Sequence, residues 1–212
     1  IDDDESSDAG EGLEVLCSRI AADWNGPLAA PIRLLPASLD PGVLPDMFEE
    51  PDRIPLGLRQ DSMLPEYFEF EDLDQHLLIL GDPQSGKTTL LRQILFEAAK
   101  RLAPQDLVIA LLESRKMLAT EIDEEYFGGV AHNGKTGHEL VNAVAVELTK
   151  RRDQGLAAEP KIWVVVDDLA IISAGVGSPL APLQPFLPQA RYLGLTVIVS
   201  RPVSGVSRAL FE

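Results

Sequence analysis

The sequence predicts an α/β domain with a mostly parallel sheet and helices on both faces. Two observations predict it: short apolar runs alternate with helical segments, and a glycine-bounded loop joins one such run to a helix. Parallel strands buried on both faces read as continuous apolar runs, and the connection between two of them usually contains a helix. We therefore expect an α/β domain over residues 54–212, preceded by a linker over residues 1–53.

The first 53 residues are acidic and rich in proline, which is typical of a linker. Residues 1–11 are rich in Asp and Glu and short in apolar side chains, so we expect disorder or a linker there. Residues 11–22 place their apolar side chains near one helical face, which predicts a short docking helix. Prolines recur throughout residues 23–53, and they favour an extended strap over a domain surface.

From residue 54 onward the predicted strands and helices alternate. Two short strands are expected at 54–58 and 67–70, ahead of the main sheet. The main sheet and its helices are then expected as strands at 77–80, 106–112, 162–166 and 195–199, and as helices ending near 102 and spanning 137–152 and 183–193. Because the chain stops soon after the last strand, we expect a fragment of a longer protein that lacks a closing strand.

A phosphate-binding loop is predicted directly after the apolar run at 77–80. Residues 81–88, GDPQSGKT, match the pattern G-x-x-x-x-G-K-[ST]. The two glycines let the backbone curl around a phosphate with its N–H groups pointing inward. Lys87 is expected to reach the β- and γ-phosphates and the Thr88 hydroxyl to ligate Mg²⁺, beside the N-terminal dipole of the following helix. The expected nucleotide-binding residues are Gly81, Asp82, Pro83, Gln84, Ser85, Gly86, Lys87, Thr88 and Thr89.

Residues 129–136, GVAHNGKT, match the same pattern but are not expected to bind a nucleotide. The preceding residues, 124–128, do not form an apolar run, so no buried strand is predicted before the match. Gly137 follows where a phosphate-binding loop would already have entered its helix. We expect a polar loop here, leading into a helix after Gly137.

Acidic residues at the end of another strand predict the second half of the site. Asp167 follows the apolar run at 162–166, where it would support Mg²⁺ bound to the nucleotide. Asp168 stands where many P-loop ATPases carry a glutamate that deprotonates the attacking water. Its side chain is one methylene shorter, and a misplacement of about 1 Å can cost about 100-fold in rate. The sequence therefore predicts nucleotide binding more firmly than fast turnover.

Three arginines are candidates for contact with the γ-phosphate of a bound nucleotide. Arg201 ends the last predicted strand, near where a parallel-sheet P-loop domain would sense that phosphate, and the alternative is a plain surface residue. With Lys87 and Asp168, it completes the expected catalytic set. Arg191 and Arg208 are candidates for donation to a neighbouring domain in trans.

Charge and composition exclude several classes of protein. Residues 1–74 hold 19 acidic and 4 basic side chains, a balance of −15, whereas residues 75–212 hold 15 and 14, a balance of −1. Neither part has the basic excess of a nucleic-acid binder, so no polynucleotide ligand is expected. A single cysteine, Cys17, excludes an internal disulfide. No apolar run approaches the roughly 18 residues of a membrane span.

With both halves of the site placed, the chain resembles the FtsK/SpoIIIE branch of P-loop ATPases. More narrowly, it is similar to the C-terminal, third ATPase domain of the EccC/EssC motor of type VII (ESX) secretion. The resemblance lies in the segments 54–58, 67–70, 76–82, 164–168, 179–183, 186–191, 193–195 and 207–212. It implies a RecA-like fold, with residues 11–53 as the linker that arrives from the second ATPase domain.

The resemblance also implies cofactors, partners and location. It implies ATP and Mg²⁺ as cofactors, and tight ATP binding with slow or conditional hydrolysis. The implied partners are adjoining ATPase domains, secretion-system membrane components and small helical substrates of the WXG type, within a multimer. The implied location is cytoplasmic, at the inner face of the membrane. Two alternatives stay open: a DNA translocase of the same superfamily, and a nucleotide-stabilised interaction module that does not hydrolyse ATP.

Overall fold

The computed structural model describes residues 5–26, 34–46, 49–70, 75–174 and 177–203, with side chains from residue 12 onward. The chain divides into two compact units, residues 1–34 and 35–212. The first unit contains one described helix, α1 (Glu5–Asp23). Disorder was therefore the wrong expectation for residues 5–11, because α1 begins with them; acidic residues in a first turn favour a helix through its dipole. The docking role of this helix stays a prediction.

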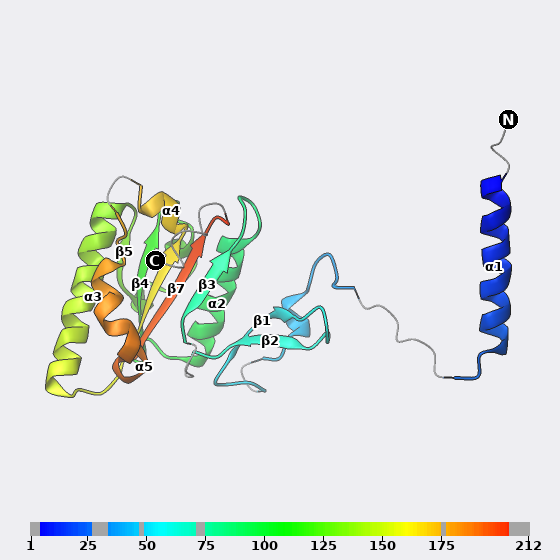
Figure 1. Cartoon of the computed structure of the whole chain (residues 1–212). Coiled ribbons are helices and arrows are strands. Elements are labelled where there is room, and N and C mark those ends of the chain that lie inside the picture. Colours follow the sequence, from blue (N-terminus) through cyan, green and yellow to red (C-terminus); the bar gives the residue numbers. More distant parts are fainter. Residues whose placement is uncertain (1–4, 27–33, 47–48, 71–74, 175–176, 204–212) are drawn as a thin grey trace. The chain divides into compact units, whose positions relative to one another are not determined.

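A five-stranded parallel sheet forms the centre of the second unit (Figure 1). Its strands, in spatial order, are β3 (Leu77–Leu80), β7 (Leu195–Arg201), β6 (Lys161–Asp167), β4 (Leu107–Glu113) and β5 (Phe127–Ala131). All four pairings are parallel. The parallel sheet is thus confirmed, and four of its strands lie within two residues of their predicted ranges.

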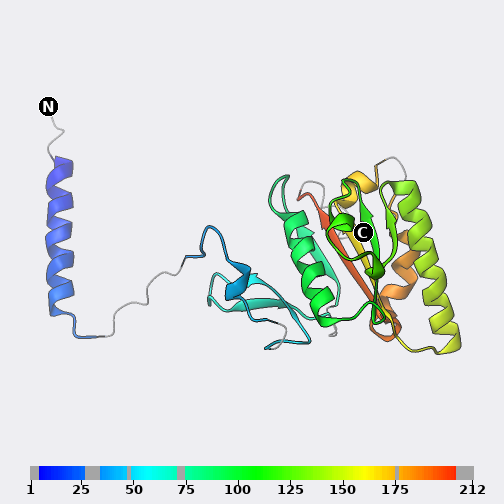
Figure 2. The ribbon, with the colours of Figure 1, turned by 180° about the vertical axis from the view of Figure 1, so that it is seen from behind.

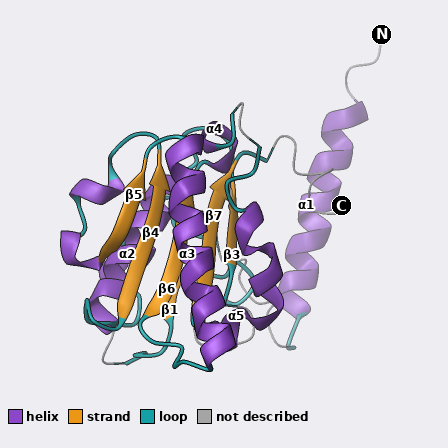
Figure 3. Ribbon diagram, turned by 90° about the vertical axis from the view of Figure 1, so that its left-hand side faces the viewer, coloured by secondary structure: helices purple, strands orange, loops and turns teal. Residues whose placement is uncertain are grey.

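Helices cover both faces of this sheet, as predicted. The helix α2 (Lys87–Arg101) packs over one face, where Trp163, Val165 and Ile198 face a fully apolar core (Figure 2). The helix α3 (Gly134–Gln154) and the short helix α5 (Ala190–Leu193) cover the other face (Figure 3). The remaining short helices are η1 (Pro41–Val43), η2 (Leu118–Thr120), η3 (Glu124–Tyr126), α4 (Leu169–Ile172) and η4 (Ala181–Gln189).

Two elements differ from the prediction for identifiable reasons. The helix expected at 183–193 is a 3₁₀-helix, η4, that leads into α5, because Pro185 and Pro188 each remove a backbone donor that a continuous α-helix would need. The edge strand β5 was not predicted, because its sequence FGGVA lacks an apolar run. A Cβ on Gly128 would lie 2.6 Å from Val108 Cγ1, so the glycine lets β5 pack against β4.

A two-stranded antiparallel hairpin precedes the sheet. Its strands are β1 (Ile54–Leu58), as predicted, and β2 (Pro65–Phe68), which lies two residues before the range predicted for it. Phe68 and Phe70 pack against Trp163 with ring centroids 6.0 and 5.6 Å apart. The hairpin is therefore anchored on the same core that supports α2.

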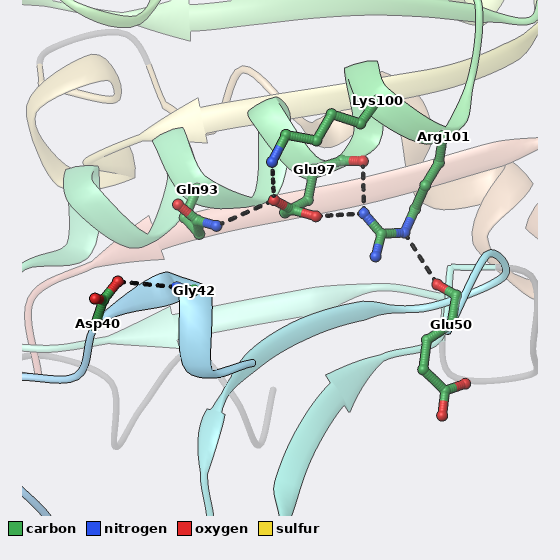
Figure 4. A network of polar contacts seen from close by, with 7 residues as sticks. All are labelled: Asp40, Gly42, Glu50, Gln93, Glu97, Lys100 and Arg101. Carbon is green, nitrogen blue, oxygen red and sulfur yellow. Dashed lines mark hydrogen bonds and ion pairs between the residues drawn. The ribbon is translucent and has the colours of Figure 1, made fainter. Parts of the chain in front are cut away.

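A polar cluster ties the segment before the hairpin to the last turns of α2 (Figure 4). Arg101 Nε donates to the Glu50 carbonyl oxygen at 3.2 Å, and its guanidinium also pairs with the Glu97 carboxylate. Lys100 Nζ lies 2.6 Å from Glu97 Oε1. The Arg101 side chain is 1% exposed and that of Lys100 is 57% exposed. The Glu97 carboxylate therefore has one buried and one solvent-exposed cationic partner. We refer to Glu50, Glu97, Lys100 and Arg101 as the α2 clamp.

Burial raises the pKa of Glu97, but hydrogen bonds from Lys100 and Arg101 outweigh burial and hold its pKa below the ordinary 4.5. A carboxyl whose pKa is depressed in the folded state stabilises the fold above its unfolded pKa, and that stabilisation is lost as the pH falls through the folded pKa. The clamp therefore contributes fully near neutral pH and fades below about pH 4.5.

Arg101→Met tests the clamp, with Lys100→Met as its matched control. Removing the buried cation leaves Glu97 with no buried partner, so the free energy of unfolding should fall by about 3 kcal/mol at pH 7. Removing the exposed cation should cost under about 1 kcal/mol. Urea denaturation at pH 7 and pH 4 measures both, and the deficit of Arg101→Met should shrink at the lower pH. Equal losses for the two variants would contradict the assignment.

Candidate functional site

The predicted phosphate-binding loop connects β3 to α2 through residues 81–86. Gln84 and Gly86 adopt positive φ values of 65° and 90°, which turn the backbone back before the helix begins. A Cβ on Gly81 would lie 2.2 Å from Ser85 Oγ, so a larger residue here would require the Ser85 side chain to move. Lys87 Nζ donates to the carbonyl oxygens of Gly81 and Asp82 at 2.8 and 2.9 Å. The loop is therefore a compact, glycine-dependent cradle crossed by the lysine ammonium.

The cradle meets the predicted acidic residue across the sheet. Thr88 Oγ1, in the first turn of α2, lies 2.9 and 3.1 Å from the two carboxylate oxygens of Asp167, at the end of β6. The strands β3 and β6 are not neighbours, because β7 lies between them. Gly81 N donates to the Arg201 carbonyl oxygen at 3.2 Å, so the tip of β7 holds the start of the loop. The structure thus brings the two predicted halves together.

Two buried polar residues extend this site beyond the prediction. Ser200 of β7 donates to Asp167 Oδ1 at 3.0 Å. Glu113 of β4 is the register partner of Asp167, and its carboxylate accepts hydrogen bonds from the amides of residues 117–119. Strand alternation places Ser200, Asp167 and Glu113 on the sheet face that α2 covers. In the sequence each of these residues directly ends an apolar run, but that pattern does not show which strand ends lie together.

Asp168 lies next to this polar row in a left-handed conformation. Its φ and ψ are 60° and 76°, and its amide donates to Ser200 Oγ at 2.8 Å. Aspartate visits this region more readily than glutamate does, because its short polar side chain tolerates the left-handed backbone. Asp168 Oδ1 is buried and has no hydrogen-bond partner within the described part of the chain. A buried acceptor in this state is free to bind a ligand or a water.

The three candidate arginines are placed differently. Arg201 is half-buried at the tip of β7, beside the entrance of the loop, so the structure brings it to the site. Arg191 is exposed on α5, which precedes β7 and therefore lies at the opposite end of the sheet from the loop. Arg208 lies outside the described residues. The roles predicted for all three stay predictions.

The second pattern match has a different geometry from the first. Only His132 and Asn133 separate β5 from α3, whereas six residues separate β3 from α2. The Asn133 side chain caps α3 by accepting from the Thr136 amide at 3.0 Å, and Lys135 is exposed. The expected polar loop is therefore wrong in detail, because β5 continues into the match as far as Ala131 and the helix already begins at Gly134. Two residues are too few to encircle a phosphate.

The residues at the first match fit a magnesium nucleotide. Hydroxyl and carboxylate oxygens are the ligands that Mg²⁺ prefers, and Thr88 and Asp167 supply both. The loop offers backbone N–H groups and an ammonium for phosphate oxygens, at the N-terminus of a 15-residue helix. The buried, unpartnered Asp168 Oδ1 supplies an acceptor beside them. This set of groups suits ATP with Mg²⁺.

Comparisons with known proteins point the same way. Residues 45–162 match the family model described as the FtsK/SpoIIIE family. The ESX secretion system protein EccC of Thermomonospora curvata is 32% identical over 100% of this chain and 17% of its own length. The ESX-1 secretion system protein EccCb1 of Mycolicibacterium smegmatis is 32% identical over 76% of the chain and 30% of its own length. The chain therefore spans less than a third of these curated relatives.

Solved structures show the same fold. The structure of Thermomonospora curvata EccC (ATPases 2 and 3) in complex with a signal sequence peptide superposes with a TM-score of 0.77 at 32% identity. It covers 95% of this chain, which in turn covers 38% of that chain. Within the described residues, no helix combines the length and the apolar character that crossing a membrane requires.

Thr88→Val tests the metal half of the site, and Thr136→Val at the second match is the matched control. Removing the Thr88 hydroxyl should weaken ATP binding in the presence of Mg²⁺ by about 10- to 100-fold. Binding in EDTA should change much less, because the loop amides and Lys87 remain. Calorimetric titration with and without Mg²⁺ measures the difference. An equal loss under both conditions would contradict a metal role for Thr88.

Proposed function

The chain belongs to the FtsK/SpoIIIE family, and on this basis we propose that it is an ATP- and Mg²⁺-binding ATPase domain of a type VII protein-secretion motor. The proposal includes tight ATP binding with slow or conditional hydrolysis. The observation that carries it is the contact between Thr88 and Asp167, which joins the glycine-bounded loop to the acidic end of β6. The chain's similarity to the EccC ATPases supports the assignment to secretion.

The division of labour follows from the site's geometry. The loop amides and Lys87 would bind the phosphates, and Thr88 and Asp167 would hold Mg²⁺. Mg²⁺, when bound, would neutralise charge on the phosphate oxygens. Asp168 would orient the attacking water through its unpartnered Oδ1 and accept a proton from it. Arg201, beside the loop entrance, is the candidate for contact with the γ-phosphate.

Slow hydrolysis is proposed because of the length and position of Asp168. The aspartate carboxylate reaches about one bond less far than a glutamate carboxylate would. The left-handed backbone at residue 168 changes the direction of the side chain but not its length. A domain that binds ATP without turnover is the second candidate, and the same residue favours it. A DNA translocase is the less favoured alternative, because residues 75–212 carry no basic excess.

The proposed setting is that of the relatives. We propose that the domain works beside adjoining ATPase domains in a multimer. We also propose that other parts of the assembly keep the domain at the cytoplasmic face of a membrane. The solved Thermomonospora curvata protein was bound to a signal sequence peptide. By analogy, small helical WXG-type substrates and membrane components of the secretion system are the proposed partners, with no nucleic acid among them.

Lys87→Ala tests nucleotide binding, and Lys135→Ala is its control in the second match. Loss of the ammonium should weaken ATP binding about 10- to 100-fold, the range for a hydrogen bond to a charged group. Lys135→Ala should bind as the unmodified chain does, because Lys135 lies on an exposed helical surface. Fluorescence titration with a labelled ATP analogue measures both. No measurable affinity in the unmodified chain would overturn the proposed function.

Asp168→Asn distinguishes a domain that hydrolyses ATP from one that binds ATP without turnover. The amide keeps the size of the side chain but cannot accept a proton as a base, so turnover should fall at least 100-fold while ATP affinity stays within about threefold. Phosphate release is measured with the full chain, alone and beside its adjoining ATPase domains. Bound ATP with turnover at background in every combination would favour the non-hydrolysing alternative.

A further inference from the structure

The edge strand β3 carries the loop at residues 81–86, but its own sequence specifies its pairing register only weakly. It reads LLIL, apolar at every position, and within the described sheet it pairs with β7 alone. A one-residue slip in register exchanges the two faces of a strand, and the cost of burying polar side chains normally prevents it. In β3 such a slip would only exchange apolar side chains. Contacts outside its four residues are therefore needed to fix the register.

Two side chains directly before β3 make such contacts. The strand β7 begins three residues before its first pairing with β3, so the start of β7 has no partner in the main chain of β3. Gln75 Nε2 donates to the Leu195 carbonyl oxygen. His76 Nδ1 accepts from the Val197 amide at 3.0 Å. A side-chain donor and a side-chain acceptor thus take the place of main-chain groups that β3 is too short to supply.

These two contacts are specific for one register. A slip of one residue moves a strand by about 3.3 Å along its neighbour, which breaks a hydrogen bond of ordinary length. Gln75 is 5% exposed, so a slip would leave its buried amide without a partner. At the other end of β3, Gly81 N donates to the Arg201 carbonyl oxygen at 3.2 Å, in the same register. The start of the loop is therefore placed by contacts at both ends of β3.

We propose that Gln75 and His76 are positioning residues for ATP binding, which hold β3 in the register that places the loop, and that protonation of His76 weakens this hold. The inference rests on the proposed function, since it takes the loop as the ATP site. A neutral imidazole can accept through Nδ1, whereas an imidazolium donates from both nitrogens. The charged ring would therefore direct an N–H group at the Val197 N–H group, and that hydrogen bond would be lost.

The sign of the pH dependence follows from the surroundings of His76. Desolvation lowers the pKa of His76 from its ordinary 6.5, so the folded chain favours the neutral acceptor form. A base whose pKa is depressed in the folded state stabilises the fold above its unfolded pKa. The stabilisation is therefore complete above pH 6.5 and is lost as the pH falls from 6.5 through the folded pKa.

His76 lines a groove of about 800 Å³ together with residues of the hairpin and the start of β3. The described titratable side chains that line this groove with it are Arg59, Asp61, Glu66, Tyr67 and Glu69. The three carboxylates are each ion-paired with an arginine, and desolvation raises the pKa of Tyr67 above its ordinary 10.0. Residues 195–199 of β7, LTVIV, contribute no titratable group. Of these groups, His76 is thus the one that changes charge between about pH 5 and 8.

His76→Asn and His76→Leu test the hold, and His138→Asn on the exposed surface of α3 is the matched control. Asparagine keeps an acceptor near the position of Nδ1 that does not titrate, whereas leucine removes the acceptor. ATP affinity with Mg²⁺ is measured by calorimetry on the full chain at pH 7.5 and 5.5. The terminal phosphate of ATP titrates in this range as well, so each protein is compared with His76→Asn at the same pH.

Relative to His76→Asn, the unmodified chain should bind ATP within threefold at pH 7.5 and about 10-fold more weakly at pH 5.5, the effect of losing one hydrogen bond. His76→Leu should bind about 10-fold more weakly at both pH values. His138→Asn should follow the unmodified chain. Parallel pH profiles for the unmodified chain and His76→Asn would overturn the inference.

Gln75→Glu reverses the pH dependence when it is added to His76→Asn. At pH 7.5 the carboxylate faces the Leu195 carbonyl oxygen and cannot donate, so ATP affinity should fall about 10-fold. Burial raises the pKa of such a carboxyl and its protonated form donates again, so affinity should recover to within threefold at pH 5.5. If this variant does not fold, Gln75→Met removes the donor without adding charge and should bind about 10-fold more weakly at both pH values. Unchanged affinity in either variant would contradict the role of Gln75.

Amide hydrogen exchange at Val197 reports the hydrogen bond in the absence of ATP. His76→Leu should lower the protection of this amide at least 10-fold, and His76→Asn should keep it within threefold. Unchanged protection in His76→Leu would overturn the inference, as would lost protection with unchanged ATP affinity. Absence of ATP binding by the unmodified chain at pH 7.5 would instead overturn the proposed function, and protection at Val197 would still show whether His76 holds β7.

Discussion

The contact between Thr88 and Asp167 is the interaction on which the site depends. It joins the first turn of α2 to the end of β6, although the strands that carry these two elements are separated by β7. A parallel sheet makes this possible because all its strands end at one edge, where loops from several of them converge. The first turn of α2 must then lie close enough to this edge for Thr88 to contact Asp167. Its buried face, packed on Trp163 and Val165, holds it there.

The helix α2 is held at both ends by polar contacts and along its length by apolar ones. Thr88 at its start faces the acidic pair, and Arg101 at its end pairs with Glu97 and the Glu50 carbonyl oxygen. Between them, its buried leucines and isoleucine pack against the sheet. The segment that precedes the hairpin is therefore connected through one helix to the loop at residues 81–86.

The two copies of the G-x-x-x-x-G-K-[ST] pattern show what such a pattern does and does not specify. In the structure each joins a strand to a helix, but β5 already contains the first three residues of the second match. The first leaves six residues for the turn and the second leaves two, so only the first can surround a phosphate. The side chains after the second glycine then differ in environment: Lys87 crosses its loop, whereas Lys135 is exposed on α3. Loop length, not the pattern, separates the two.

The sequence by itself determined the parallel sheet, the glycine-bounded loop at residues 81–88 and the acidic pair, because apolar runs and glycine spacing are local properties. It also located Asp167 at a strand end. Only the tertiary structure decided that Ser200 and Glu113 join this pair, since their relation to Asp167 depends on strand order and register, which no local pattern encodes. The edge strand β5 was missed for a related reason: its glycines pack against β4 and α3, and that need arises only once the sheet is assembled.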